Sequence, residues 1–552
     1  MILQGTKTNP LFLALLKARG IADAESQAVF LKPDYLATKH DPYLLPDMKE
    51  AVERLALAQK RQEKVVIYGD YDIDGLTATS LLLDTFKSFG ISADSFIPNR
   101  FSDGYGLSKR AIKDLAADGA EVIITVDCGS LSHEEISLAN DLGVDVIVTD
   151  HHSVADTMPP AVAVINPKRP GHGYPFLDLA GVGVAFKLVQ ALQKRLPGLP
   201  EGQEKWLLDL VALGTVCDVV ELRDENRTNV YWGLNVIAKT RRPGLKALMA
   251  VCGVEPAKIT ARTLGYVLGP RLNASGRLET AKLSLDLLTA TDNMIALKIA
   301  GQLDDMNKER RKDQDRIFKE ACEKADQYDN DPVLILSGPD WSHGIVGIVA
   351  AKLMERYKKP VFLIQELGQE SKGSARSFGD FSAVDAIRAS DKHLIKGGGH
   401  KLAAGVTLKT ESIDSFKQSV ISHYESLGLK PQAGLLEPQA DVTASELKHM
   451  NEELLELLEH LQPYGHGNSE PIFCFNGLSV VQTQFMGDNK QHIKIFFIDK
   501  NGQPLTTVAF NMAHAYNVEP GEVAKVWIEL YLNEWRGKRT IEGRLKKLLI
   551  EN

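Results

Sequence analysis

Val65-Val66-Ile67-Tyr68-Gly69-Asp70-Tyr71-Asp72-Ile73-Asp74-Gly75-Leu76-Thr77 is the stretch that decides the fold. A short apolar run changes here into three acidic residues at alternating positions, followed by a helical pattern. Buried parallel strands are continuous β-branched runs, and α/β sheets place their chemistry at the carboxyl ends of such strands. Crowded carboxylates repel one another unless a positive charge lies between them, and a divalent cation with oxygen ligands is the usual one. From this stretch alone, an acidic surface loop remains equally open.

The same pattern returns twice further along the chain. Two more apolar runs, 121–127 and 144–150, end in aspartate, and His151 and His152 follow the second. Helical patterns separate the runs, so the chain predicts a mostly parallel α/β sheet with helices on both faces. One aspartate after a strand is more often a helix cap than a ligand. Three at the same edge of one sheet favour a metal site.

A fourth acidic position extends the possible ligand set. The apolar stretch 207–218, whose period is uncertain, ends in Asp218. Carboxylates together with imidazole suit Mn²⁺ or Mg²⁺, with zinc possible. Two such ions need a bridging carboxylate, and paired ions clamp phosphoryl oxygens and generate hydroxide from bound water. The chemistry indicated is hydrolysis of a phosphodiester or pyrophosphate.

Composition sets the broad class. A chain of 552 residues predicts three or four domains. The net charge of −8 argues against a uniformly basic nucleic-acid coat but allows a local basic channel. Five cysteines with no CxxC pair fit a reducing compartment and give no zinc signature. With no stretch of about 20 apolar residues and no charged leader, we expect a cytoplasmic protein that does not bind membranes. We also expect it to be a monomer.

Several motifs in order resemble the DHH phosphoesterase superfamily. The first set is Gly69 to Gly75, Val126-Asp127-Cys128-Gly129, Thr149-Asp150-His151-His152 and Val216-Cys217-Asp218. A second set is similar to the branch of single-strand-specific 5′→3′ DNA exonucleases: Gly269 to Arg277, Ser374-Ala375-Arg376-Ser377, and Gly397-Gly398-Gly399-His400 followed by Ala403-Ala404-Gly405. The resemblance runs from about residue 45 to the C-terminus, and the order of the motifs makes it specific.

The resemblance implies two divalent ions, Mn²⁺ or Mg²⁺, and a role for each acidic residue. The implied metal ligands are Asp72, Asp74, Asp127 as the bridging carboxylate, His151 and Asp218. The implied catalytic group comprises His152, which faces the scissile phosphate, the bridging Asp127, and Asp70, which with Asp150 orients its neighbours. Tyr68 stands where some members have a ligand histidine, which suggests more water around one ion.

The resemblance also implies a pocket for a 5′-terminal phosphate. Ser374 and Arg376 resemble residues that bind this phosphate, together with Arg277 and Arg100, because the planar guanidinium binds phosphate oxygens bidentately. Glycines before His400 let a backbone approach a phosphate, although a tight turn is the alternative. The remaining implied substrate contacts are Arg271 and Asn273 in the second motif set, and Trp535 and Arg536 near the C-terminus, with Lys538 and Arg539 beside them.

Changes in composition and periodicity along the chain predict five segments. They are an N-terminal helical segment (1–45), a DHH catalytic domain (46–290), a long connecting helix with a charged, solvated middle (291–328), a DHH-associated α/β domain (329–430), and an OB-type β-barrel (431–552). In the last segment we interpret most strand aromatics (Phe473, Phe496, Trp527, Tyr531, Trp535) as core, and the final residues as a basic tail.

The function expected from the resemblance is that of a single-stranded-DNA-specific 5′→3′ exonuclease releasing mononucleotides in recombination and repair. Its implied partners are single-stranded DNA, a helicase and a single-strand-binding protein. One rival is a phosphodiesterase for short oligoribonucleotides or cyclic dinucleotides, whose family members typically lack the C-terminal barrel. Another is a DNA-binding scaffold without catalysis, which would have lost acidic ligands that are present here.

Overall fold

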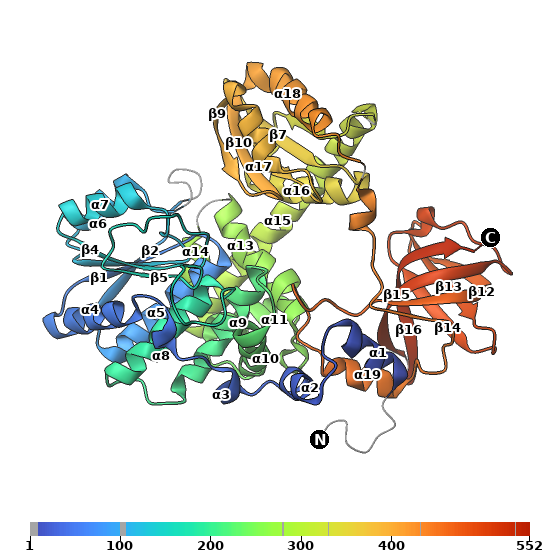
Figure 1. Ribbon diagram of the computed structural model, residues 1–552, viewed down its shortest axis with the longest axis horizontal. Coiled ribbons are helices and arrows are strands. Elements are labelled where there is room, and N and C mark those ends of the chain that lie inside the picture. Colours follow the sequence, from blue (N-terminus) through green and yellow to red (C-terminus); the bar gives the residue numbers. More distant parts are fainter. Residues whose placement is uncertain are drawn as a thin grey trace. The chain divides into compact units, whose positions relative to one another are not determined.

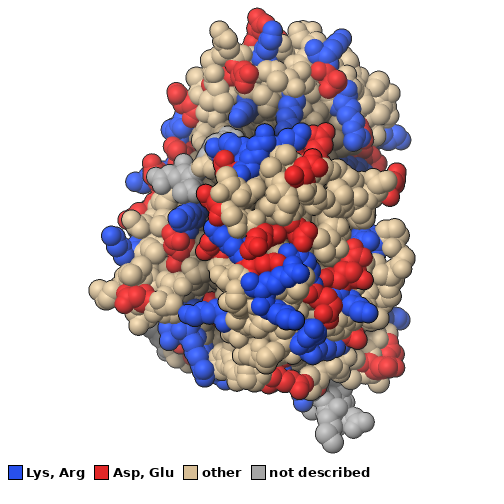
Figure 2. Space-filling model, turned by 90° about the vertical axis from the view of Figure 1, so that its left-hand side faces the viewer, with Lys and Arg blue, Asp and Glu red and all other residues tan. Residues whose placement is uncertain are grey.

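The computed structural model describes residues 9–99, 106–278, 281–328, 330–430, 432–535 and 537–551. The chain forms two compact units. The first comprises residues 1–269, 284–297 and 438–552, and the second comprises 270–283 and 298–437. Among the described residues, no helix is long and apolar enough to cross a membrane. On the face seen in Figure 2, lysines and arginines are interspersed with aspartates and glutamates.

A five-stranded parallel sheet forms the body of the first unit, in the order β2-β1-β3-β4-β5 (Figure 1). Its strands are β1 (Val65–Gly69), β2 (Ala93–Phe96), β3 (Val122–Val126), β4 (Asp145–Thr149) and β5 (Ala163–Ile165). Every residue of β1 and β3 is buried, because helices cover both faces. These are α4 (Met48–Arg61), α5 (Ile73–Phe89) and α8 (Gly181–Arg195) on one face, and α6 (Lys109–Ala117) and α7 (His133–Asp141) on the other. The predicted parallel sheet is confirmed.

The acidic loop after β1 leads directly into α5. The Asp72 carboxylate accepts hydrogen bonds from the backbone N–H groups of Asp74 (2.9 Å) and Gly75 (3.2 Å), so Asp72 is the N-cap. A Cβ atom at Gly75 would lie 2.5 Å from the Asp70 carbonyl oxygen, so glycine is required there. Helix capping, the alternative role of an aspartate after a strand, therefore applies to Asp72, one of the three acidic residues of this loop.

The apolar stretch of uncertain period is the helix α9 (Leu208–Cys217), and Asp218 is its C-cap. A helix that is apolar on all sides must be buried, and α9 packs against α5, α8 and α10 (Asp224–Ile237). The body continues with α11 (Pro243–Val251), α12 (Ala261–Thr263), the π-helical turn η4 (Leu264–Leu268) and α14 (Lys282–Leu288).

The N-terminal helices share a hydrophobic core with the C-terminal strands. Leu11, Phe12, Leu15 and Leu16 of α1 (Pro10–Ala18) are buried in one cluster with residues of the last domain. The Asn9 side chain donates to the His449 carbonyl oxygen at 2.7 Å. The other short helices here are α2 (Ala24–Leu31), α3 (Tyr35–Thr38) and η1 (Pro42–Leu44). The N-terminal segment, which was predicted to be helical, thus packs against the C-terminal domain.

The C-terminal domain has six strands in the order β11-β12-β13-β14-β16-β15, with β15 pairing back to β12. They are β11 (Val442–Ala444), β12 (Phe473–Met486), β13 (His492–Ile498), β14 (Pro504–Ala509), β15 (Val523–Trp535) and β16 (Lys538–Ile550), and α19 (Glu452–Glu459) precedes β12. The predicted OB-type arrangement is confirmed.

Two details of the C-terminal prediction were wrong. The basic tail is strand β16, which pairs with β15 from Ala524↔Ile550 to Trp535↔Lys538. Its buried residues, Leu545 and Leu548 among them, are interleaved with lysines and arginines that conceal the apolar pattern. Of the predicted core aromatics, Phe473 is buried, whereas Phe496, Trp527 and Tyr531 are half-buried.

The second unit is built on a mixed sheet in the order β6-β7-β8-β10-β9. Its strands are β6 (Leu334–Gly338), β7 (Val361–Leu367), β8 (Glu370–Arg376), β9 (Leu394–Gly399) and β10 (Ala403–Lys409), and its helices include α13 (Gly269–Leu278), α16 (His343–Tyr357), α17 (Ala383–Ala389) and α18 (Ile413–Ser426). The predicted long helix is α15 (Asn293–Ala325). Its charged middle is not wholly solvated, because Asp304 and Arg310 are buried.

Candidate metal centre

The carboxyl ends of three neighbouring strands bring their aspartates to one edge of the first sheet. In the register of β1, β3 and β4, Gly69 lies opposite Val126, and Val126 lies opposite Thr149. The residue that follows each of these three is an aspartate: Asp70, Asp127 and Asp150. The N-terminus of α8 and the C-terminus of α9 close the same space, as the contacts described below show.

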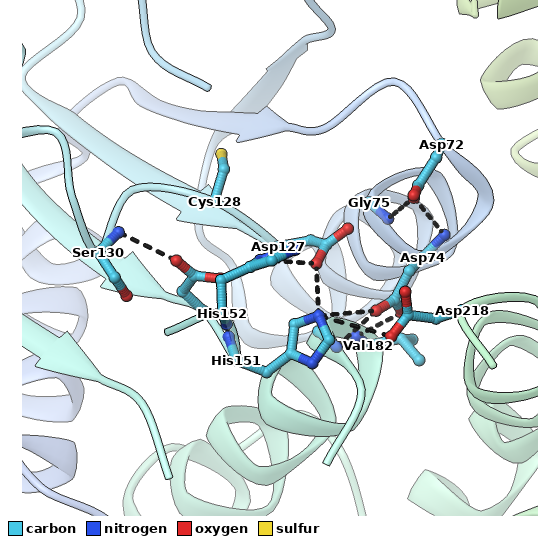
Figure 3. Close-up of polar contacts among 12 residues, drawn as sticks. Asp72, Asp74, Gly75, Asp127, Cys128, Ser130, His151, His152, Val182 and Asp218 are labelled. Atoms are coloured by element: carbon cyan, nitrogen blue, oxygen red, sulfur yellow. Dashed lines mark hydrogen bonds and ion pairs between the residues drawn. The ribbon is translucent and has the colours of Figure 1, made fainter. Parts of the chain in front are cut away.

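His151 lies at the centre of this group (Figure 3). Its Nε2 is 3.1 Å from Asp127 Oδ1, 3.5 Å from Asp218 Oδ2 and 3.9 Å from Asp74 Oδ2. Burial and then the charge of His152 lower the pKa of His151 to about 3. The imidazole is therefore neutral at ordinary pH, which is the form that binds a metal ion.

The three carboxyl groups around His151 are held in conditions that disfavour their charge. Burial and the neighbouring Asp72 raise the pKa of Asp74 to about 7, and burial with Asp74 raises the pKa of Asp218 to about 9. Burial and the same acids raise the pKa of Asp127 well above its usual range. Asp127 Oδ1 and His151 Nε2 are buried without a well-aligned hydrogen bond. A divalent cation would satisfy these atoms and reverse the pKa shifts, so the residues fit a metal.

Three sets of side chains each bring their ligand atoms within 4.8 Å of one another. They are Asp74-His151-Asp218, Asp70-Asp72-Asp127 and Asp127-His151-His152. Because Asp127 belongs to two sets and approaches His151 of the other, it lies between two candidate positions. The geometry accommodates two ions with Asp127 between them. Asp70, expected only to orient its neighbours, lies close enough to be a ligand itself.

Backbone groups that the sequence analysis did not single out hold Asp74 in place. The N–H groups of Gly181 (2.6 Å) and Val182 (2.8 Å), in the first turn of α8, donate to its carboxylate. A Cβ atom at Gly181 would lie 2.7 Å from Asp127 Cβ, and one at Gly214 would lie 2.9 Å from Asp74 Oδ1. The glycine-spaced stretch from Leu179 to Gly183 was the available signal in the sequence.

The backbone of Asp127 adopts the left-handed conformation, with φ of 62°. Non-glycine residues rarely adopt it, and aspartate and asparagine tolerate it best. Such backbone strain gathers at functional sites, where the surrounding structure holds it in place. The position therefore restricts which substitutions can be used to test the carboxylate without disturbing the loop.

The two adjacent histidines are placed in opposite electrostatic states. Asp150 accepts hydrogen bonds from the N–H of His151 (2.7 Å), the N–H of Ser130 (3.0 Å) and Nδ1 of His152 (2.8 Å). Burial acts to lower the pKa of His152, but the Asp150 carboxylate outweighs it and raises that pKa above its ordinary value. His152 therefore binds a proton more readily than an ordinary histidine, whereas His151 binds one less readily, so His152 is the better proton donor of the two.

Tyr68, at the position where a ligand histidine was considered, is fully buried in the sheet. Its hydroxyl donates to the Gly106 carbonyl oxygen at 3.1 Å, and its ring packs 4.9 Å from that of Phe96. The described contacts of Tyr68 thus tie the strand to its neighbours.

The residues expected to bind phosphate gather around the first turns of α16 in the second unit. Arg277 Nη1 donates to the Gly344 carbonyl oxygen at 2.9 Å. A Cβ atom at Gly347 would lie 3.0 Å from both Ser374 Oγ and Arg376 Nη2. The three predicted side chains therefore lie along the first two turns of one helix.

The other predicted substrate contacts are more scattered. The glycine run is the exposed strand β9, in which Gly398 pairs with Gly405, and it leads to an exposed His400. Arg271 Nε bonds to Asp304 at 2.8 Å, and Asn273 is half-buried on α13. Trp535 ends β15, Lys538 begins β16, and Arg539 lies 3.7 Å from Glu452. Arg100, Arg536 and the side chain of Trp535 lie outside the described residues.

Comparison with known proteins agrees with this geometry. Family models match residues 64–215 (DHH family, N-terminal domain), 330–425 (DHHA1 domain) and 443–547 (RecJ OB domain). The single-stranded-DNA-specific exonuclease RecJ of Escherichia coli is 36% identical over 522 residues, which cover 90% of this chain and 89% of that protein. The chain belongs to the RecJ family. The Bacillus subtilis RecJ is 36% identical over 97% of this chain and 67% of its own length.

Two solved structures of one RecJ match nearly the whole chain. RecJ of Thermus thermophilus in complex with Mn²⁺ superposes with a TM-score of 0.85 at 28% identity, covering 99% of this chain and 76% of that one. The same protein in complex with Mg²⁺ gives a TM-score of 0.78 at 27% identity, covering 98% and 74%. The carboxylate and imidazole ligands were predicted to favour Mn²⁺ or Mg²⁺, and RecJ structures have been solved in complex with each of these ions.

Proposed function

We propose that this RecJ-family chain is a metal-dependent exonuclease that degrades single-stranded DNA from its 5′ end and acts in recombination and repair. The observation that carries the proposal is the pair of ligand sets that meet at Asp127, on a chain with DHH, DHHA1 and RecJ OB domains. Paired Mn²⁺ or Mg²⁺ ions supply a nucleophile from water and offset charge on the phosphate.

The protein residues supply position and charge at fixed atoms. Asp72, Asp74, Asp127, His151 and Asp218 would hold the ions, with Asp70 added on its geometry. His152, held by Asp150, is half-exposed, its pKa is raised, and in its protonated form it can donate to a phosphate oxygen. The neutral His151 cannot compete for that proton, so the two histidines divide the tasks of ligand and donor.

We assign the 5′ polarity to Arg277, Ser374 and Arg376. A terminal phosphate carries more negative charge than an internal one and can bind bidentately to a guanidinium. A pocket that requires this group starts the reaction at a 5′ end. His400, Arg271, Asn273 and, outside the described residues, Arg100 are proposed as further contacts.

The segment borders, partners and location are also proposals. We place the catalytic domain at 46–290, the DHH-associated domain at 329–430 and the OB domain at 431–552, with 291–328 between. The compact second unit includes 270–283, so part of the catalytic segment lies in that unit. A helicase and a single-strand-binding protein are proposed partners, and the chain is proposed to act as a cytoplasmic monomer.

A single oligonucleotide experiment tests the proposal. A 3′-labelled single strand with a 5′-phosphate should shorten from its 5′ end in Mn²⁺ or Mg²⁺, and a blunt duplex should not. Asp127→Asn should abolish shortening, and Arg376→Ala should remove the preference for a 5′-phosphate over a 5′-hydroxyl. Cleavage restricted to very short oligonucleotides would support the small-substrate rival. Binding without cleavage in either metal would support the scaffold.

A further inference from the structure

Tyr266 is an exposed aromatic residue on an unusual turn. It lies in η4, a single π-helical turn, and 75% of its surface is accessible. Single exposed apolar residues are common and need no explanation by themselves. The position of the turn is what distinguishes Tyr266, because single π-turns are frequent at functional sites.

The turn is fixed to the helix that carries a proposed metal ligand. Cys217, the residue before Asp218, has its Sγ 3.7 Å from the Leu264 carbonyl oxygen. A Cβ atom at Gly269 would lie 2.8 Å from the same sulfur, and one at Gly265 would lie 3.6 Å from Val216 Cγ1. The backbone on both sides of Tyr266 therefore packs directly on the last turn of α9. The turn that carries Tyr266 is therefore held against the helix whose C-cap is Asp218, and the Tyr266 side chain itself is exposed.

Arg262, two residues before the turn begins, lies near the OB domain. The Arg262 guanidinium lies 5.3 Å from the centre of the Tyr266 ring. Burial and Glu529 raise the pKa of Glu470, and the charges of Arg544 and Arg262 oppose them. Arg262 of the catalytic body and Arg544 of β16 thus both act on the Glu470 carboxyl group. The segment that carries Arg262 and the OB domain therefore lie close together.

The OB domain is attached at the same place. The Leu222 N–H, four residues after Asp218, donates to the His466 carbonyl oxygen at 2.8 Å. The outer face of the OB strands nearby carries Tyr531, 5.8 Å from the Arg544 guanidinium, and Phe496, 5.9 Å from Lys494 Nζ. Half-buried aromatics beside cations are what single-strand-binding surfaces use.

We propose that Tyr266 is a stacking platform for one base of the substrate strand, on the 3′ side of the scissile phosphate. There the strand leaves the metal centre toward the outer OB face, and Arg262 holds the ring and neutralises an adjacent phosphate. The inference rests on the proposed exonuclease function and adds a positioning residue to it. Stacking on an aromatic ring is tolerant of sequence, as an enzyme that degrades any strand requires.

The test combines a side-chain deletion with a base deletion. Single-turnover kcat/KM is measured on 5′-phosphorylated strands with one abasic site at each of positions two to eight. For the wild type, one position should lower kcat/KM by about tenfold, the range of one lost stacking contact. Tyr266→Ala should lower kcat/KM on the intact strand by a similar factor and show no further loss at that position. Tyr266→Trp should restore both.

Two controls separate stacking from damage to the fold. Tyr43→Ala removes another exposed tyrosine, one that bonds to Ala191 of α8, and should leave both values unchanged. Mn²⁺ affinity, measured by titration, should be the same in Tyr266→Ala and wild type. Additive losses at every abasic position, full activity of Tyr266→Ala, or weakened Mn²⁺ binding would each overturn the inference. If the wild type degrades no strand, the proposed exonuclease function fails. The stacking role is then tested by binding: it would be overturned if the wild type and Tyr266→Ala each bound intact and abasic strands with equal affinity.

Discussion

Replacing Arg227 with methionine should loosen the OB domain and the N-terminal helices from the catalytic body. Arg227 lies on α10 with 3% of its surface exposed. Its guanidinium donates to the carbonyl oxygens of Phe30, His460, Leu461, Gln462 and Pro463 at 2.9 to 3.4 Å. These carbonyls lie at the ends of α2 and α19, where helix dipoles place partial negative charge. The guanidinium also lies 3.8 Å from the centre of the Phe30 ring.

The size of the stability loss depends on how many of these carbonyl oxygens are left without a hydrogen bond. Methionine fills the volume but donates no hydrogen bond, and each carbonyl that stays dry destabilises the fold by about 1–3 kcal/mol. If two of the five carbonyl oxygens gain no hydrogen bond from water or protein, the local opening free energy falls by about 2–6 kcal/mol. Arg227→Lys keeps the charge but loses the planar fork, so its effect should be smaller.

Native-state hydrogen exchange of the amides in α2 and α19 measures this opening directly, without assuming two-state unfolding of a multi-domain chain. Arg223→Met, just before α10 with a side chain 64% exposed, is the matched control and should change exchange by less than about 0.5 kcal/mol. Unchanged exchange at α2 and α19 in Arg227→Met would refute the reasoning.

Three further predictions concern the metal centre. Gly181→Ala places a methyl group against Asp127, so Mn²⁺ affinity should fall at least about tenfold with the fold retained, and an unchanged titration would contradict this. Asp127→Asn keeps a residue that tolerates the left-handed backbone, so it should lower activity by at least about 100-fold while the metal-free melting temperature stays the same or rises; a lower melting temperature would show that the carboxylate is structural. In metal-free protein, the raised pKa values of Asp74 (about 7) and Asp218 (about 9) mean that the folded state binds more protons than the unfolded chain above pH 4. Thermal stability should therefore fall from pH 5 to pH 9, and saturating Mn²⁺ should remove the slope; a pH-independent melting temperature without metal would contradict the shifts.

The acidic edge was predictable because its signal is local. Each buried strand is a continuous apolar run, and the next residue is an aspartate, so the parallel sheet and the convergence of Asp70, Asp127 and Asp150 follow from the sequence. The α9 stretch was ambiguous because a helix buried on all sides and a buried strand share the same apolar composition. Strand β16 was missed because its outward lysines and arginines dominate a pattern whose inward residues are few.

The supporting contacts could not be predicted because they join distant parts of the chain. The Gly181 and Val182 amides reach Asp74 across more than one hundred residues of sequence. Arg227 contacts both α2 and the loop after α19, and nothing in the sequence near Arg227 indicates either partner. Side-chain chemistry marks candidate ligands, but which backbone groups orient them depends on the packing of complete helices.

The shared core of α1 and the C-terminal strands has a consequence for synthesis. Leu11, Phe12, Leu15 and Leu16 are synthesised more than 400 residues before Val442, the first of the C-terminal residues that cover them. At about 5–20 residues per second, that interval is roughly 20–90 s. Throughout it the nascent chain presents an apolar helix with no native partner. A chain that ends before Val442 leaves the apolar face of this helix uncovered, and exposed apolar surface of this kind makes incomplete chains prone to aggregation.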